Sequence, residues 1–225
     1  MLFFDPFMAL FRFLALLPAL VGHEFAHAWS ADRLGDPTPR MQGRLTLNPL
    51  AHLDPLGTLM ILFAPIGWAK PVQVNPLNFR DPARGMMLST ACGPGSNLAQ
   101  GLVVGLALRG LLAYLPVQNV QGNPLVGYLA ILVMINFVLA VFNLIPLGPL
   151  DGHHIMEYYL PYPANESYRR FNHQYGMFIL FGLILASFVL RLPLLTYVIL
   201  LPASLLGRLV VGVDPWALFS YAMAG

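Results

Sequence analysis

Two histidines and a glutamate lie within the five residues His23-Glu24-Phe25-Ala26-His27. Residues four apart share one face of an α-helix, so His23 and His27 can point at a single metal ion. Zinc binds imidazole nitrogen readily, and a catalytic zinc site combines three protein ligands with one open position. Glu24 would lie beside that position and could take a proton from a water molecule there. This spacing therefore predicts a zinc-dependent hydrolytic site.

The segment in front of this motif is strongly apolar. Residues 7–22 carry a single charge, Arg12. The alternative to a metal site is a chance match on a core helix, with both histidines bonded to the backbone. Unpaired polar groups are expensive in hydrocarbon, and ionisable groups inside membrane spans usually mark function. The apolar flank therefore favours a metal site placed within a membrane.

The composition is that of a membrane protein. Of the 225 residues, 57% are hydrophobic and only 10% are charged, against about 25% charged in soluble domains. The net charge of +2 gives no support for a nucleic-acid partner. Cys92 is the only cysteine, which excludes an internal disulfide and a thiolate zinc site. We therefore expect an all-α membrane protein, a polytopic helical bundle of about five to six transmembrane segments.

The apolar segments indicate where these spans lie. Full spans are expected at about residues 7–34, 86–115, 125–145, 173–190 and 192–211. The second would open with a broken, polar entry at residues 91–97, which contain two glycines and a proline. Between the first two spans, Leu56–Gly67 is too short for an ordinary crossing and predicts a re-entrant segment. Trp68 and residues 70–74 after it predict an interfacial strand or loop.

The loops differ in charge, and this difference predicts an orientation. The loops at residues 35–85 and 151–172 are basic or mixed in charge, whereas residues 116–124 carry no charge. By the positive-inside rule the first two loops face the cytoplasm and the N-terminus faces outside. The C-terminal part of the first span, with His23 and His27, would then meet the end of the third span, with Asp151, on the cytoplasmic side.

Two histidines leave a catalytic zinc site one protein ligand short. The candidates for the third ligand are Asp151, His153, His154, His52, Asp54 and His173. Asp151 is favoured because Gly148-Pro149 and Gly152 let the backbone bend there and approach closely. It also follows an apolar span, where a lone carboxylate would be costly. The alternative is that Asp151 caps a helix after a proline break.

Three motifs in this order resemble the site-2 protease family of intramembrane zinc metalloproteases. They are His23-Glu24-x-x-His27, Gly93-Pro94-x-x-Asn97, and Asn143-x-x-Pro146-x-x-x-Leu150-Asp151-Gly152. The segments at 43–58 and 67–76 resemble the compact prokaryotic members of the family, and the likeness covers about residues 14–155. The loops are too short for an inserted PDZ or CBS-type domain. The resemblance implies one integral-membrane peptidase domain over 1–225, with a catalytic core at about 7–155 and accessory spans at about 173–212.

The resemblance also implies a role for each matching residue. His23, His27 and Asp151 would bind one zinc ion per chain, and Glu24 would activate water. Asn143 would hold the substrate backbone or the developing oxyanion, because a side-chain amide can donate to a carbonyl oxygen that gains charge. If the family resemblance is set aside, a helix-end cap is an equally good interpretation of Asn143.

The remaining polar positions are less well defined. Asn97 would line the site or support the bent backbone around it. His153 and His154 stand where the family often has other residues, and one of them could orient Asp151 or a substrate. Both could equally be interfacial. We interpret His52 as a loop histidine that could approach the site. We interpret His173 as a histidine at the membrane interface.

The resemblance thus implies an intramembrane zinc metalloprotease of a prokaryotic cell membrane, with its active site toward the cytoplasm. Its partners would be the lipid bilayer and a membrane-protein substrate with a transmembrane segment. Substrate selection would come from the membrane core, the re-entrant region or a separate regulatory partner. The alternatives are an ion-binding transporter and a catalytically inactive scaffold of the same fold. The substrate, its cleavage site, a need for prior cleavage and the oligomeric state are not specified by the sequence.

Overall fold

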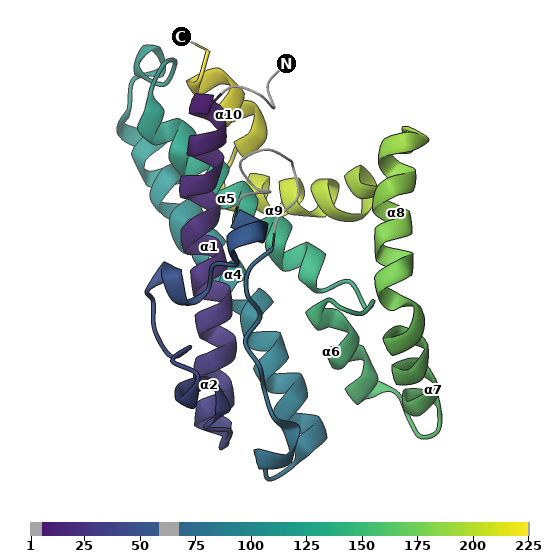
Figure 1. Cartoon of the computed structure of the whole chain (residues 1–225). Helices are drawn as coiled ribbons and strands as arrows, with labels where there is room; N and C mark the ends of the chain where they lie inside the picture. The colour runs from purple at the N-terminus through teal and green to yellow at the C-terminus, as the bar shows by residue number, and fades with distance from the viewer. Residues whose placement is uncertain (1–5, 59–67, 225) are drawn as a thin grey trace.

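The structure is a computed structural model that describes residues 6–58 and 68–224 (Figure 1). Its described residues form helices and connecting loops. The helices are α1 Pro6–Leu34, α2 Thr38–Met41, α4 Pro82–Tyr114, α5 Pro124–Asn143, α6 Asp151–Tyr159, α7 Ala164–Phe171, α8 Met177–Val189, α9 Leu201–Val211 and α10 Pro215–Ala222. Short 3₁₀ turns lie at Pro49–Ala51, Pro76–Asn78 and Val117–Asn119, and π-helical turns at Asn172–Gly176 and Thr196–Leu200 lead into α8 and α9. The expected all-α architecture is confirmed.

Helices α1, α4 and α5 form the centre of the molecule. α4 packs against both α1 and α5, and α9 and α10 cover further faces of α5. The apolar core lies mainly along α5, where Val126, Ile131, Val133 and Phe137 are buried. α8 stands apart from this bundle in Figure 1, with α9 crossing between them. The helices that carry the three sequence motifs are therefore the ones that share the core.

The first three expected spans match α1, α4 and α5 closely. Among the described residues, α4 and α5 are each long and apolar enough to cross a membrane. The segments Thr196–Val211 and Pro215–Ala222, bent by 77° relative to each other, would together count as a third. The expected number of about five to six spans stays a prediction. Helix α10 was not expected, because the apolar pattern was taken to end with the last span.

One correction concerns residues 91–97, which lie inside α4 and do not form a broken entry. Proline in a helix interior costs about 3 kcal/mol because it removes one hydrogen bond and crowds the preceding turn. Here Gly93, Pro94 and Asn97 are all buried, in a helix that packs on two neighbours. Packing and polar contacts of this segment thus keep the helix continuous through Pro94.

At residues 70–74, where a strand or a loop was expected, the structure has the loop. Those residues have no regular secondary structure, and the described part of the region has only a single antiparallel bridge, between Leu53 and Ala69. Pro71 has no N–H to donate to a ladder, and the N–H of Val72 is bonded to Glu24. Two consecutive positions are thus unavailable for pairing. Most of the expected re-entrant segment, residues 59–67, lies outside the described residues.

Candidate metal centre

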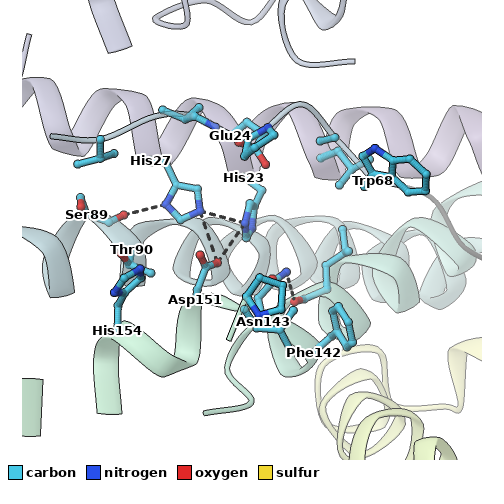
Figure 2. Close-up of a pocket in the computed structure, with 18 of the residues that line it drawn as sticks. His23, Glu24, His27, Trp68, Ser89, Thr90, Phe142, Asn143, Asp151 and His154 are labelled. Atoms are coloured by element: carbon cyan, nitrogen blue, oxygen red, sulfur yellow. Dashed lines mark hydrogen bonds and ion pairs between the residues drawn. The ribbon is translucent and has the colours of Figure 1, made fainter. Parts of the chain in front are cut away.

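The side chains of His23, His27 and Asp151 converge at the contact between α1 and α6 (Figure 2). The two Nε2 atoms lie 3.0 Å apart. Asp151 Oδ2 lies 3.2 Å from Nε2 of His23 and 3.4 Å from Nε2 of His27. Asp151 is separated from the two histidines by more than a hundred residues, and the fold brings it to them. The structure therefore joins the three residues that the sequence suggested as ligands.

The hydrogen bonds of the two rings leave their Nε2 atoms available for a metal. Nδ1 of His23 lies 2.7 Å from Oδ1 of Asn97, and Nδ1 of His27 lies 2.9 Å from the carbonyl oxygen of Ser89. Both partners are acceptors, so each Nδ1 carries the proton and each Nε2 presents a lone pair. Histidines that bind metal ions commonly donate their other ring N–H in this way.

The carboxylate completes a donor set that fits a zinc ion. Oδ2 of Asp151 is buried and has no hydrogen-bond partner among the described residues. A buried oxygen of this kind beside two nitrogen lone pairs needs a cation to offset the cost of its burial. Two imidazole nitrogens and one carboxylate oxygen form a usual ligand set for catalytic zinc. These residues thus fit the metal that the motif predicts.

Gly93 of α4 leaves the space that the two imidazole rings occupy. A β-carbon at this position would overlap Nε2 and Cε1 of His27 and would lie 2.8 Å from Cε1 of His23. Any other residue at position 93 would therefore press on the ligand rings. The glycine of the Gly93-Pro94-x-x-Asn97 motif is explained by this close approach of α4 to α1.

Gly152 has a similar role next to Asp151. Asp151 is the first residue of α6, and the residue at the N-cap position is Leu150. A β-carbon on Gly152 would overlap the carbonyl oxygens of Leu144 and Ile145, which follow α5. Glycine thus lets α6 begin directly against the end of α5. This contact holds Asp151 toward α1, and the alternative that Asp151 is an N-cap is wrong.

A chain of buried amides extends from His23 into the helix bundle. Asn97 Nδ2 donates to the carbonyl oxygen of Ala19 at 3.0 Å and to Oδ1 of Asn136 at 3.1 Å. Asn136 in turn donates to the carbonyl oxygen of Leu132 at 2.9 Å. Both asparagines are 0% exposed. These bonds fix which way the Asn97 amide faces, with its oxygen toward His23.

Asn136 was missed in the sequence analysis. Asn97 was expected to line the site or support the backbone, and its bond to His23 gives it a more direct contact with the ligands. Asn136 lies in the most apolar stretch of α5, between Ile135 and Phe137. A lone amide in such a stretch is costly unless it is bonded, and that cost was the available signal. No recognised motif includes this position.

The Glu24 carboxylate lies beside the cluster and is 8% exposed. Its Oε2 accepts a hydrogen bond of 3.1 Å from the backbone N–H of Val72. Val72 belongs to an extended loop that runs along α1, so a segment distant in sequence holds the carboxylate. Glu24 is thus close to the candidate metal position and restrained by a neutral backbone donor.

A cavity of about 470 Å³ opens onto these residues. Its walls are mostly apolar, and they include Trp68, Leu139 and Phe142 beside the polar group Asn143 (Figure 2). The Asn143 amide donates to the carbonyl oxygen of Leu139 at 3.0 Å. An amide nitrogen has two N–H groups, so one remains for another acceptor. The cavity could therefore hold a peptide backbone near the cluster.

The two histidines after Asp151 take different positions. His154 lines the cavity, and burial and the nearby His153 lower its pKa to about 4. It is then neutral at neutral pH, so its 3.9 Å contact with Glu157 is not an ion pair there. His153 bonds the carbonyl oxygen of Leu150 at 2.6 Å and stacks on His154. Neither one joins the ligand cluster.

The other histidines lie elsewhere. His52 is buried in the loop after α2, where its Nε2 is 2.8 Å from the carbonyl oxygen of Thr46. This placement agrees with a loop histidine. His173 is exposed in the π-helical turn before α8. Asp54 accepts a hydrogen bond from the N–H of Gly57. None of the three belongs to the cluster that the described residues form.

Comparisons with known proteins agree with this geometry. The model of peptidase family M50 matches residues 91–186, which include Asn97, Asn143 and Asp151. A Bacillus subtilis protein named "Putative zinc metalloprotease YwhC" is 39% identical over 181 residues, covering 79% of this chain and 82% of the relative. This chain belongs to peptidase family M50. The family is that of the site-2 proteases, so the peptidase is an intramembrane metalloprotease.

More distant relatives share part of the sequence. Proteins named "Putative zinc metalloprotease Rip2" from Mycobacterium tuberculosis and Mycolicibacterium smegmatis are 35% and 31% identical over 150 and 153 residues. Each match covers 64% of this peptidase and 55% of the relative. The chain thus spans about half the length of these two relatives. No solved structure is significantly similar to it.

Proposed function

We propose that this peptidase hydrolyses peptide bonds in or near the transmembrane segments of membrane proteins, with one zinc ion held by His23, His27 and Asp151. The observation that supports this proposal is the convergence of these three side chains beside Glu24, at one end of a largely apolar cavity. When bound, zinc supplies Lewis acidity that polarises a carbonyl group and makes water more acidic.

Glu24 is the proton carrier in this proposal. Its carboxylate accepts a proton from the attacking water and returns it to the nitrogen of the leaving amine. Asn143 uses its remaining N–H to stabilise charge on the carbonyl oxygen of the scissile bond. A helical substrate hides its carbonyls in internal hydrogen bonds. Residues that break helices should therefore make a substrate span easier to cleave.

The extended loop at residues 70–74 limits how a substrate could pair with it. The N–H groups of Lys70 and Val72 are bonded to His52 and Glu24, and Pro71 has none. An extended substrate would therefore pair with the portion from the Val72 carbonyl to Val74. Proline in place of Val74 should slow cleavage if this pairing occurs.

The basic and mixed-charge loops at residues 35–85 and 151–172 support a site toward the cytoplasm of a prokaryotic membrane, by the positive-inside rule. Both ends that carry ligands, the C-terminal part of α1 and the start of α6, lie at the same end of the bundle as α2 and α7 (Figure 1). Arg40, Arg169 and Arg170 lie in α2 and α7. Substrate selection would come from the membrane core, the expected re-entrant segment or a separate regulatory protein.

The decisive experiment compares wild type with Glu24→Gln on a single-span reporter substrate, with zinc measured in both. We expect the variant to keep one zinc per chain and to lose nearly all cleavage, since general base catalysis contributes about 10²–10⁴-fold. Retained cleavage would contradict the proposed role of Glu24. Retained ion flux in Glu24→Gln without any cleavage by wild type would indicate a transporter, and absence of bound zinc would indicate a scaffold.

A further inference from the structure

The loop of residues 68–78, here called the strap, runs along α1 beside the cavity. Trp68, Ala69, Pro71, Val72 and Val74 of the strap line the cavity wall (Figure 2). The one hydrogen bond that the described structure gives the Glu24 carboxylate comes from the strap, through the N–H of Val72. The position of the strap therefore decides where this donor lies.

Arg44 fixes the strap on one side of Val72. Its guanidinium donates to the carbonyl oxygens of Lys70 and Pro71, each at 3.2 Å, and to that of Ala51. Arg44 is 5% exposed, and within residues 6–58 and 68–224 it forms no ion pair. A planar guanidinium carries five N–H donors in fixed directions, so one side chain can join three carbonyl groups.

Asp36 fixes the strap on the other side. Its buried carboxylate accepts from the N–H of Asn75 at 2.7 Å and from the Asn78 side chain at 2.6 Å. Asp36 lies two residues after Leu34, the last residue of α1. The strap is thus attached on both sides of Val72. Its residues before Val72 are bonded to Arg44, in the loop after α2. Its residues after Val72 are bonded to Asp36, just past the end of α1. Val72 lies between these two attachments.

These contacts matter because a glutamate side chain has several rotatable bonds. A general base must lie within hydrogen-bond reach of the proton that it removes. Displacement of a catalytic group by about 1 Å can cost about 10²-fold in rate. A backbone donor on Oε2 restrains the carboxylate while its other oxygen remains available to a proton.

We infer that Arg44 is a positioning residue of this peptidase: it holds Lys70 and Pro71 so that the N–H of the next residue, Val72, orients the Glu24 carboxylate for proton transfer. This inference rests on the proposed role of Glu24. It assigns a catalytic consequence to an arginine that touches neither the cavity nor the metal ligands. In the sequence, Arg44 was one of several basic loop residues and part of the segment 43–58 that resembles the family, with no role of its own.

The test compares Arg44→Met, Arg44→Lys and the control Arg40→Met in the full chain. Arg40 lies four residues earlier and pairs on the surface with Asp32. We expect Arg44→Met to lower kcat by about 10–100-fold, with KM and zinc content close to wild type. Arg44→Lys should restore part of kcat, since an ammonium can satisfy some of the carbonyls. Arg40→Met should match wild type.

A double-mutant cycle separates positioning from a merely structural role. Glu24→Asp shortens the side chain, so its carboxylate can no longer reach Val72. If Arg44 acts through Glu24, adding Arg44→Met to Glu24→Asp should change kcat by less than about 3-fold, a strongly non-additive result. Full additivity would overturn the inference. So would a rise in KM at constant kcat, which would assign the strap to substrate binding alone, or a rise in kcat, which would show that the strap obstructs the site.

Two further variants address poor folding of Arg44→Met. Val72→Pro removes the N–H that Glu24 accepts, whereas Val72→Ala keeps it. Both variants shorten or alter the same cavity-lining side chain, so the informative quantity is the difference between them. The inference requires a larger loss of kcat in Val72→Pro than in Val72→Ala, and equal losses would overturn it. Failure of wild type to cleave would instead defeat the proposed function. An active wild type with an unaffected Arg44→Met would defeat only the role of Arg44.

Discussion

Oδ1 of Asn136 accepts a hydrogen bond of 3.1 Å from Nδ2 of Asn97, whose own oxygen lies 2.7 Å from Nδ1 of His23. The contact joins the middle of α5 to a candidate ligand on α1 through α4. Because an amide has distinct donor and acceptor ends, Asn136 helps to decide that Asn97 presents oxygen to the histidine. The tautomer of His23 thereby depends on a residue two contacts away.

Substitution of these asparagines should weaken zinc binding in a graded way. Loss of a residue that bonds a metal ligand typically costs about 10–100-fold in metal affinity, and we expect this for Asn97→Leu. Asn136→Leu removes one of the two acceptors of Asn97 and should cost less, about 3–10-fold on the same scale. Competition with a chromogenic zinc chelator would measure both. Unchanged affinity in Asn97→Leu would contradict the chain of contacts.

Ser96→Ala is the matched control for this series. Ser96 is adjacent to Asn97, and its hydroxyl bonds the carbonyl oxygen of Gly93 within the same helix. Its removal should leave zinc affinity unchanged. A loss in Ser96→Ala equal to that in Asn97→Leu would indicate a general disturbance of α4 rather than a specific effect on His23.

Gly93→Ala should abolish zinc binding while the helix survives. The added methyl group would overlap the His27 ring, so the two imidazoles could not keep their positions. Alanine favours a helix over glycine by about 1 kcal/mol, so α4 itself should not weaken. Zinc content and circular dichroism of the purified variant would check both statements.

Gly95→Ala provides the comparison within the same turn of α4. A β-carbon at Gly95 would meet nothing within 4 Å. This variant should bind zinc like wild type and unfold at a slightly higher temperature, by the same helix preference. Full zinc occupancy in Gly93→Ala would show that the rings have more room than the structure indicates.

The ligand set could be predicted because its residues conflict with their surroundings. His23, His27 and Asp151 are ionisable groups on or beside apolar segments, and such groups are costly without a function. Their meeting followed from topology, since α1 and α5 both end at the same side. The helices were predicted well because long apolar runs leave few alternatives.

The parts that were missed or wrong depend on backbone contacts that the sequence does not display. Of the two alternatives at residues 70–74, strand or loop, the loop forms, because Glu24 uses the N–H of Val72. Arg44 was one of several basic residues of the 35–85 loop, and nothing in the sequence showed that it is buried against backbone carbonyls. Asn136 belongs to no recognised motif. In each case the decisive partner is a peptide group or a distant amide, and side-chain patterns do not specify those partners.

Asp36 should stabilise the junction of α1 and the strap in a pH-dependent way. Burial raises the pKa of its carboxyl, but hydrogen bonds from Thr38, Asn78 and Asn75 together lower the pKa by a larger amount. The resulting pKa lies below the ordinary value. A carboxyl whose pKa is lowered in the folded state stabilises the fold at pH values above its unfolded pKa of about 3.9. This stabilisation is lost as the pH falls through the folded-state pKa.

Asp36→Asn should therefore destabilise the peptidase at neutral pH by about 1–3 kcal/mol, the usual cost of leaving buried donors unsatisfied. The difference between variant and wild type should shrink as the pH falls from about 4 through the lowered pKa of folded Asp36, because unfolded wild type binds a proton first and folded wild type does so only at lower pH. Thermal unfolding in detergent across this range would measure it. Glu166→Gln, at an exposed pair with Arg170, should stay within about 1 kcal/mol of wild type. A difference for Asp36→Asn that is the same at every pH would show that the charge of Asp36 contributes nothing and that only the shape of its side chain matters.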